Sequence, residues 1–364
     1  MKSEFENKQE RIQAFLEKHK LDGLLLRRAS NFAWATCGAS ASVNSAESNG
    51  EASLLITRTG RHLITNNIEV ARLVQEEKLD SDWEFHIAPW YEDQQKTIDL
   101  LVHALKLGGD GCWAGELDLS AELTHLRANL TVEEGDRLRE LGRLCAEAME
   151  TAICAVRPGQ SEYEIAACLA MESERRGVQA IVNLVATDER VFSFRHPLPT
   201  DKRIDKYAML VLCGRKWGLI CSITRLLYFG RIPVELRRKA NAVSSVDAAF
   251  MAATKPGATL GEIFQEGVRT YESVGFPDEW QFHHQGGLAG YGPREIIASP
   301  DSKTRIQTGQ VFAWNPSITG VKSEDTILVT EHRTEVLTAI QDWPMLEVQY
   351  QGQMFLRPAI LERD

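Results

Sequence analysis

The chain has 364 residues, of which 43% are hydrophobic and 25% charged, and its formal net charge is −10. This length exceeds what one ordinary hydrophobic core requires, so we expect two domains. Every apolar run is far shorter than the roughly 20 residues of a membrane helix, and an acidic chain without a basic stripe repels polyanions. We therefore predict neither a membrane nor a nucleic acid as a partner.

The N-terminus and the cysteines indicate where the protein resides. The first ten residues, MKSEFENKQE, are charged from the second position and lack the apolar core of a secretory signal. The seven cysteines are odd in number and scattered, with no C-x-x-C pair, which is typical of reduced thiols rather than of a disulfide or zinc framework. We predict a cytoplasmic protein.

The first third of the sequence alternates between helical and strand patterns. The predicted elements are an amphipathic helix over residues 7–20, a buried strand DGLLL over 22–26 and a hairpin over 52–65. Two histidines of this region, His19 and His62, belong to no recognisable motif, and we interpret both as packing or solvent contacts. We expect a first domain of the α/β type over residues 1–127.

The second region, residues 128–364, opens with a long helix whose start is marked by the capping box Thr131 and Glu134. The segment RPGQSEYEIA (157–166) then combines a Pro-Gly turn with a second capping box, and KPGATLGEIF (255–264) repeats that combination. Each copy follows an amphipathic helix and precedes strands. This internal repeat predicts two copies of one α+β unit, with a site drawing residues from both.

Four further motifs follow one another in a characteristic order. They are HPLPT (196–200), GLICSITRLLYFG (218–230), HHQGGLAGY (283–291) and GVKSEDTILVT (320–330). Together with the doubled Pro-Gly helices, they resemble the creatinase and aminopeptidase family, M24, which includes methionine aminopeptidase, Xaa-Pro peptidases, prolidase and creatinase. The resemblance implies an α+β chain, in which a C-terminal pita-bread domain (128–364) follows a smaller creatinase/prolidase-like N-terminal domain (1–127).

The resemblance also locates the metal ligands of the family. Metal-dependent members hold two divalent ions with two aspartates, one histidine and two glutamates, and the corresponding positions here are Val211, Ser222, His284, Asn315 and Glu324. Two ions about 3.5 to 4 Å apart need several anionic ligands to offset their repulsion. Because only two of the five ligands remain, we predict no dinuclear centre and no cofactor.

A single ion is the alternative that the residues leave open. His284, Glu324 and Cys213 offer three ligands with an open fourth position, as in some zinc sites. Cys213 lies in the apolar run YAMLVLC, however, where a buried and inert thiol is the simpler interpretation.

Creatinase is the family's precedent for hydrolysis of a C–N bond without metal. By this resemblance His196 would act as general base and then as general acid, since an imidazole near neutral pKa can take a proton from water and return it to a leaving nitrogen. His284 and Glu324 complete the predicted catalytic set, with Glu324 orienting an imidazolium or holding a cationic substrate. Outside this context, His196 would be a turn histidine before Pro197.

Further residues are candidates for substrate contact. We predict that the Tyr291 hydroxyl donates to a developing oxyanion, although a packed aromatic ring is an equal alternative. Arg294 could hold a substrate carboxylate or form a surface ion pair with Glu295. Ser222 and Asn315, at vacated ligand positions, are assigned to substrate binding, and Ser222 could also be an activated hydroxyl.

Several residues near these motifs are predicted to be structural. Thr224 and Arg225 look like strand ties, and Thr224 shares the face of Ser222. Strand alternation turns Asp325 away from Glu324, and Cys221 away from Ser222, so neither is expected to take part in chemistry.

Three hypotheses for the function remain. The first, which we favour, is a metal-independent, creatinase-like hydrolase of a small amide, amidino or imino-acid compound. The second is an Xaa-Pro-type dipeptidase or aminopeptidase with an atypical metal site, and the third is a non-catalytic pita-bread binding protein. The resemblance also implies a homodimer acting on a small-molecule or dipeptide-like substrate, with NFAWATCG (31–38) in contact with the partner subunit.

Overall fold

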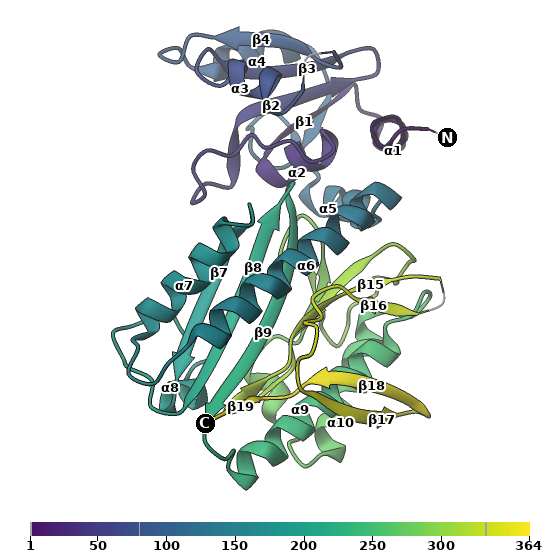
Figure 1. The fold of residues 1–364 in the computed structure, drawn as a ribbon. Helices are drawn as coiled ribbons and strands as arrows, with labels where there is room; N and C mark the ends of the chain where they lie inside the picture. Colours follow the sequence, from purple (N-terminus) through teal and green to yellow (C-terminus); the bar gives the residue numbers. More distant parts are fainter. Residues whose placement is uncertain (1, 80, 332) are drawn as a thin grey trace. The chain divides into compact units, whose positions relative to one another are not determined.

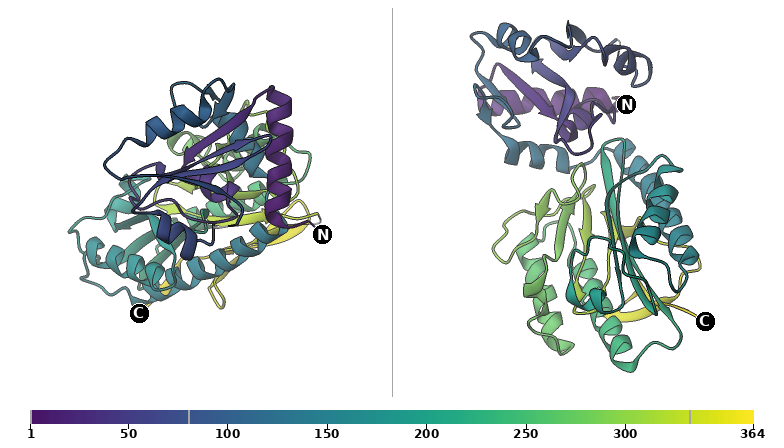
Figure 2. Two further views of the ribbon diagram at one scale, coloured as in Figure 1. Left: turned by 90° about the horizontal axis from the view of Figure 1, so that it is seen from above. Right: turned by 90° about the vertical axis from the view of Figure 1, so that its left-hand side faces the viewer.

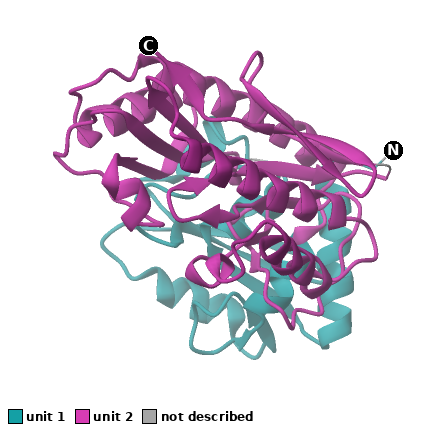
Figure 3. Cartoon of the chain, turned by 90° about the horizontal axis from the view of Figure 1, so that it is seen from below, with its two compact units in different colours: residues 1–127 teal, residues 128–364 magenta. Residues whose placement is uncertain are grey.

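The computed structural model describes residues 2–79, 81–331 and 333–364. The chain forms two compact units, Met1–Arg127 and Ala128–Asp364 (Figure 3). Among the described residues, the helices include none that is both long and apolar enough to cross a bilayer.

Unit 1 is built on one six-stranded sheet with the strand order β4-β3-β2-β1-β5-β6 (Figure 1). Its elements are α1 (Glu4–His19), β1 (Gly23–Arg28), α2 (Ala29–Ala35), β2 (Asn49–Thr57), β3 (Arg61–Asn66), α3 (Val70–Gln75), β4 (Glu84–Ala88), α4 (Gln94–Val102), β5 (Leu107–Gly109), β6 (Leu117–Asp118) and α5 (Ser120–Ala128). The predicted N-terminal helix, buried strand and hairpin correspond to α1, β1 and the antiparallel pair β2–β3.

The aromatic residues of α2 belong to the interior of unit 1. Phe32 and Trp34 are fully buried, and α2 contacts β1 and β2. The two rings therefore fill the unit's own core, and contact of residues 31–38 with a partner subunit stays a prediction.

Unit 2 contains a four-stranded sheet, a five-stranded sheet and two short strand pairs. Its first half comprises α6 (Val132–Ala155), α7 (Glu162–Glu174), β7 (Gln179–Thr187), α8 (Glu189–Ser193), β8 (Tyr207–Lys216) and β9 (Leu219–Phe229). Its second half comprises α9 (Val234–Ala253), α10 (Leu260–Ser273), η1 (Glu279–Phe282), β10 (Gly286–Ala289), β11 (Ile296–Ile297), β12 (Val311–Trp314), β13 (Ser317–Ile318), β14 (Val321–Lys322), β15 (Asp325–Val329) and β16 (Thr334–Val336). The chain ends with β17 (Met345–Tyr350), β18 (Gln353–Pro358) and β19 (Leu361–Arg363).

The predicted internal repeat is confirmed in the local structure of both halves. Each Pro-Gly turn has its glycine in the left-handed region, with φ of 87° at Gly159 and 92° at Gly257. Each following helix begins with a complete capping box, and each N-cap residue forms an isolated bridge, Ser161 to Arg203 and Thr259 to Arg305. In the right-hand view of Figure 2, the helices α6–α7 and α9–α10 lie on opposite sides of the strands of unit 2.

The two halves of unit 2 join where β9 meets the start of β15. An isolated antiparallel bridge pairs Thr224 with Glu324, and the Thr224 N–H donates to the Glu324 carbonyl oxygen at 3.2 Å. Behind this junction lies an apolar core in which the rings of Phe250 and Trp314 are stacked at 4.6 Å. Polar side chains on β9 and β15 are therefore brought together on a rigid base.

A glycine pair fixes the start of β10, one residue after the double histidine. A Cβ atom added at Gly286 would lie 2.1 Å from the Ala313 carbonyl oxygen, and one added at Gly287 would lie 2.2 Å from the Ile296 carbonyl oxygen. Gly286 also has a φ of 99°. Only glycine fits at this close approach of three strands.

Candidate active site

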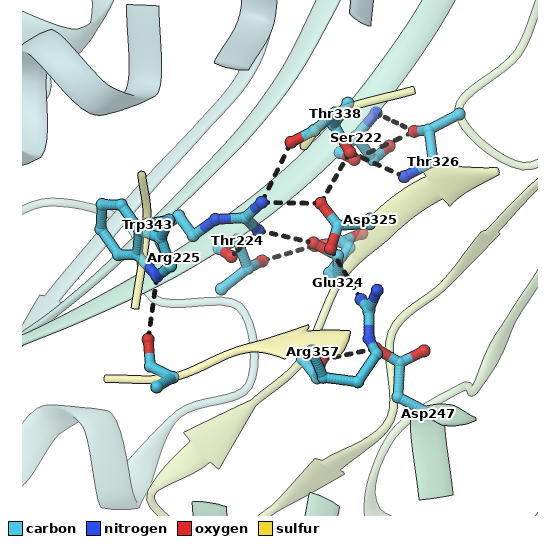
Figure 4. A network of polar contacts seen from close by, with 12 residues as sticks. Ser222, Thr224, Arg225, Asp247, Glu324, Asp325, Thr326, Thr338, Trp343 and Arg357 are labelled. Atoms are coloured by element: carbon cyan, nitrogen blue, oxygen red, sulfur yellow. Dashed lines mark hydrogen bonds and ion pairs between the residues drawn. The ribbon is translucent and has the colours of Figure 1, made fainter. Parts of the chain in front are cut away.

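Glu324 is the centre of a polar cluster at the junction of β9 and β15. Its carboxylate is almost fully buried and accepts a hydrogen bond from the Thr224 hydroxyl at 2.5 Å. Ser222 and Thr224 lie two residues apart on β9, so both side chains face the same side, as predicted. Ser222 is fixed further by its N–H, which donates to the Thr326 hydroxyl at 2.7 Å (Figure 4).

The guanidinium group of Arg294 lies between two positions that hold metal ligands in the family. One of its nitrogens is 2.7 Å from Glu324 Oε1, and the other donates to Ser222 Oγ at 3.2 Å. The Arg294 side chain is only 10% exposed. The contact with Glu324 corrects the interpretation of Arg294 as a surface ion pair with Glu295, whereas its role in holding a substrate carboxylate stays a prediction.

A second cation, which the sequence analysis missed, lies beside this ion pair. Lys322, at the end of β14, is 5% exposed, and burial lowers the pKa of its ammonium group, helped by Arg294 and opposed by Glu324. Among the described residues, no carboxylate lies within 4.0 Å of its nitrogen atom. The alternation in KSEDT could have revealed it, since Lys322 and Glu324 stand two residues apart.

These charges determine the ionisation of Glu324. Burial by itself would raise the pKa of the carboxyl group. The cations of Lys322 and Arg294, together with the hydrogen bond from Thr224, outweigh that effect and lower the pKa below its usual value. Glu324 is therefore ionised at neutral pH.

Three histidines form a cluster, one from the first half of unit 2 and two from the second. His196 Nε2 lies 3.0 Å from His283 Nε2, and the rings of His283 and His284 are stacked at 4.4 Å. The structure thus brings together the two predicted histidines, His196 and His284, with ring centroids 5.7 Å apart. It adds His283, the first histidine of the HH doublet, to which the motifs assigned no role.

All three imidazoles are neutral at physiological pH. Burial, aided by Arg294 and Lys322, lowers the pKa of His284 to about 4. Burial and the neighbouring Lys322 hold the pKa of His283 far below its ordinary range, and the same two causes lower the pKa of His196 despite Glu324. A neutral imidazole can accept a proton from water, so His196 has the ionisation state that a general base requires.

Tyr291 does not belong to this cluster. Its side chain is 3% exposed, and its hydroxyl donates to Glu134 Oε1 on α6 at 2.6 Å. This contact contradicts the predicted role as an oxyanion donor, because the hydroxyl proton is already used in a buried hydrogen bond. Tyr291 is therefore a packed aromatic residue, which was the alternative interpretation.

Asn315 remains compatible with ligand contact. It is 3% exposed, and its N–H donates to the Gln285 carbonyl oxygen at 3.1 Å. Its side-chain oxygen is buried and has no hydrogen-bond partner among the described residues. A buried acceptor without a partner is costly unless a bound donor satisfies it.

The cysteines near the site are buried thiols of raised pKa. Cys213 Sγ lies 3.2 Å from Ser222 Oγ, and burial together with the charge on Glu324 raises the pKa of its thiol. Its thiol is therefore protonated at neutral pH. Cys221 is fully buried and directs its sulfur toward the Leu138 carbonyl oxygen on α6, as strand alternation predicted.

Beneath the site, a buried network of ion pairs holds the strands in register (Figure 4). Arg225 donates to Asp325 at 2.8 Å and to the Thr338 carbonyl oxygen at 3.0 Å. Arg357 bridges Asp325 and Asp247, with a distance of 2.6 Å to each. The predicted orientation of Asp325 away from Glu324 is confirmed, and so is the role of Arg225 as a tie between strands.

These residues do not fit a pair of divalent ions. The five family positions supply one carboxylate and one imidazole, and the guanidinium of Arg294 lies on two of those positions. Lys322 adds positive charge that repels further cations. The histidine cluster is different, because one nitrogen from each of His196, His283 and His284 lies within 4.8 Å of the others and could hold one ion.

Comparison with known proteins places the chain in a family. Residues 136–331 match the metallopeptidase family M24, and residues 8–139 match the creatinase/prolidase N-terminal domain. The chain belongs to the M24 family, within its creatinase and prolidase branch, so the resemblance and the fold class read from the sequence are confirmed.

Curated relatives share part of the sequence. An uncharacterized peptidase of Staphylococcus aureus (strain MW2) is 26% identical over 236 residues, which cover 62% of this chain and 66% of that protein. An uncharacterized peptidase of Staphylococcus epidermidis is 24% identical over 232 residues, covering 61% of this chain and 65% of that protein. The match thus spans just under two thirds of the length of these relatives.

Solved structures share the fold over nearly the whole chain. The Xaa-Pro dipeptidase from Bacillus anthracis has a TM-score of 0.79 at 20% identity, covering 99% of this chain and 100% of that one. The prolidase from Pyrococcus horikoshii has a TM-score of 0.79 at 19% identity, with coverage of 92% and 99%. The N-terminal domain of the FACT complex subunit SPT16 from chickpea has a TM-score of 0.71 at 13% identity, with coverage of 93% and 96%. At these identities the likeness concerns the fold alone.

Proposed function

We propose that this M24 protein is a metal-independent hydrolase that cleaves a C–N bond in a small amide, amidino or imino-acid compound carrying a carboxylate. The observation that carries the proposal is the guanidinium of Arg294, which bridges Ser222 and Glu324 where the family binds metal. Arg294 thus supplies a positive charge at the positions where the family binds its metal ions. The neutral histidines beside it offer a proton acceptor in place of a metal-bound hydroxide.

His196 is the general base of this proposal. Its neutral ring removes a proton from water, and the resulting hydroxide adds to the carbon of the C–N bond. The imidazolium then returns the proton to the leaving nitrogen as the bond breaks. Glu324 favours the transient imidazolium, because its charge opposes the fall in the pKa of His196. His283, 3.0 Å from His196, is a positioning residue for that ring.

The charge of the site selects the substrate. Lys322 is a buried cation with no carboxylate within 4.0 Å among the described residues, and Asn315 has an unsatisfied acceptor oxygen. A substrate with a carboxylate and a neighbouring N–H group would satisfy both. Lys322 is thus a second candidate, beside Arg294, for holding the substrate carboxylate.

An Xaa-Pro-type peptidase with one metal ion is the second candidate. The three histidine nitrogens within 4.8 Å of one another favour it, and prolidases share the fold. The cations of Arg294 and Lys322 count against it, because they repel a divalent ion as they repel protons from the same rings.

The test uses the full chain after treatment with a chelator. A panel of Xaa-Pro dipeptides, N-acyl amino acids and N-amidino amino acids is incubated with the protein, and released amine is followed by mass spectrometry. We expect cleavage that persists in the chelator and falls by about 10²- to 10⁴-fold in His196→Ala. His125→Ala, at an exposed histidine of unit 1, is the matched control and should leave the rate unchanged.

Two results would overturn the proposal. Activity that disappears on chelation and returns with added zinc or manganese would establish the single-metal peptidase. If no member of the panel is cleaved and none shifts the melting temperature, the protein is a binding module of this fold. We also propose a homodimer, as the family resemblance implies, and light scattering of the purified chain measures its mass directly.

A further inference from the structure

Two histidines and a glutamate face one another on the sheet of unit 1. β3 and β4 are parallel, with His62 paired to Glu84 and Ile64 paired to His86. Glu84 and His86 stand two residues apart on β4, so both side chains lie on one face of the sheet, beside His62. The two histidine side chains are 19% and 21% exposed and that of Glu84 is 65% exposed, so solutes can reach the group.

The separations of the three side chains match the edges of a metal coordination polyhedron. His62 Nδ1 lies 3.0 Å from His86 Nε2 and 3.1 Å from Glu84 Oε2, and His86 Nε2 lies 3.6 Å from Glu84 Oε1. Ligands about 2.0 to 2.1 Å from a tetrahedral zinc ion are roughly 3.3 Å apart. The group is thus preformed to within a few tenths of an ångström.

Gly60 in the hairpin before β3 gives the His62 ring its position. A Cβ atom at residue 60 would lie 2.8 Å from His62 Nε2. The ring therefore rests against the bare backbone of the turn with one nitrogen and presents the other, Nδ1, to β4. A side chain at residue 60 would displace the ring from its partners.

We infer that His62, Glu84 and His86 form a binding site for one divalent transition-metal ion of the zinc class. Two imidazoles and one carboxylate are ligands that zinc accepts, and three protein ligands leave a fourth position for water. The site is separate from the histidine cluster of unit 2. It also gives His62 a role beyond the packing or solvent contact to which the sequence analysis assigned it.

The bound ion would link the edge strand β4 to its neighbour β3. Among the described residues, β4 is the terminal strand in the order β4-β3-β2-β1-β5-β6, with β3 beside it. Ligands on both strands join them at this edge of the sheet, where the described strands pair with β4 on one side alone. Binding would therefore raise the stability of unit 1, since an ion that binds only the folded state shifts the folding equilibrium.

The experiment measures Zn²⁺ binding to the full chain after removal of metal. Isothermal titration compares the natural chain with the double variant His62→Gln, His86→Gln and with the control His103→Gln, His125→Gln, which replaces two exposed histidines of the same unit. We expect the first variant to lose one equivalent of Zn²⁺, or to bind it more than about 100-fold more weakly. The control variant should bind like the natural chain, and Mg²⁺ should not substitute.

A thermal melt read by circular dichroism distinguishes loss of the site from loss of the fold. Both variants should melt as the natural chain does without zinc, whereas added Zn²⁺ should raise the melting temperature of the natural chain and the control only. Zinc held elsewhere, for instance by the histidines of unit 2, is present in all three proteins and cancels in the comparison. Equal binding and equal thermal shifts in the three proteins would show that the group is a hydrogen-bonded trio, and would overturn the inference.

Discussion

Glu324 and Asp325 are neighbours in the sequence, but their side chains lie in opposite electrostatic environments. On the Asp325 side, two guanidinium groups face two carboxylates, and all four groups are buried. On the Glu324 side, Arg294 and Lys322 face one carboxylate, beside three imidazoles of lowered pKa. The balanced side holds the strands together, and the side with surplus positive charge is the one that an anionic ligand would complete.

Disrupting the ion pairs on the Asp325 side should have the largest effect on stability. Asp325→Ala removes the carboxylate that pairs with buried Arg225 and leaves buried Arg357 with Asp247 alone, among the described residues. We expect the free energy of unfolding to fall by about 3 to 5 kcal/mol, because an uncompensated buried charge is costly. Urea unfolding followed by circular dichroism measures the change.

The matched control for that experiment is an exposed ion pair. Arg238→Ala removes the partner of Glu235 on the surface of α9, where solvent screens both charges. We expect its unfolding curve to coincide with that of the natural chain. If Asp325→Ala also left the unfolding curve unchanged, the network of Arg225, Asp325 and Arg357 would not be what holds β9 and β15 together.

Lowering the pH should reduce the free energy of unfolding through the three histidines beside Glu324. The folded-state pKa values of His196, His283 and His284 lie below the unfolded value of about 6.5. The unfolded chain therefore binds more protons as the pH falls. Their contribution to stability is complete above pH 6.5 and is lost as the pH falls from 6.5 toward about 4, the pKa of His284.

Urea unfolding at about pH 7.5, 6 and 5 measures this loss. His283→Gln should flatten the dependence, because it removes the ring whose pKa is lowered most. His103→Gln, at an exposed position of unit 1, should leave the slope unchanged. A chain whose stability is level across this range would contradict the neutral state of the cluster.

Removing the positive charge of Lys322 should have the smallest effect on stability. Lys322→Met replaces a buried ammonium with an apolar side chain of similar length, so we expect stability to change little or to rise. Acetate, as a minimal carboxylate, should stabilise the natural chain by about 0.4 kcal/mol at a concentration equal to its Kd. The variant should show no such gain in a thermal shift assay. Equal stabilisation of both proteins would remove Lys322 from the proposed substrate site.

Local sequence signals predicted the secondary structure and the internal repeat well. Capping boxes, the repeated Pro-Gly turns and strand alternation act over a few residues, so they located the helices, the internal repeat and the orientation of Asp325 away from Glu324. The motif order located His196, His284 and Glu324. These features depend on the chain near each residue.

The contacts within the site depend on parts of the chain that lie far apart, and the sequence did not predict them. Arg294 meets Glu324 across 30 positions, and Tyr291 meets Glu134 across 157. An arginine pairs with whichever carboxylate the fold brings near, and a tyrosine hydroxyl with whichever buried acceptor lacks a donor. Lys322 and His283 were visible in the motifs, but their importance comes from the burial that the fold imposes.

The glycine pair after the double histidine has a consequence for how the sequence can drift over generations. Gly286 and Gly287 are required by the backbones packed against them, whatever the neighbouring imidazoles do. In a population of variants, intolerance at these two glycines therefore reports selection for folding, whereas intolerance at His283 and His284 reports selection for chemistry. A lineage that had abandoned catalysis would keep the first pair and lose the second.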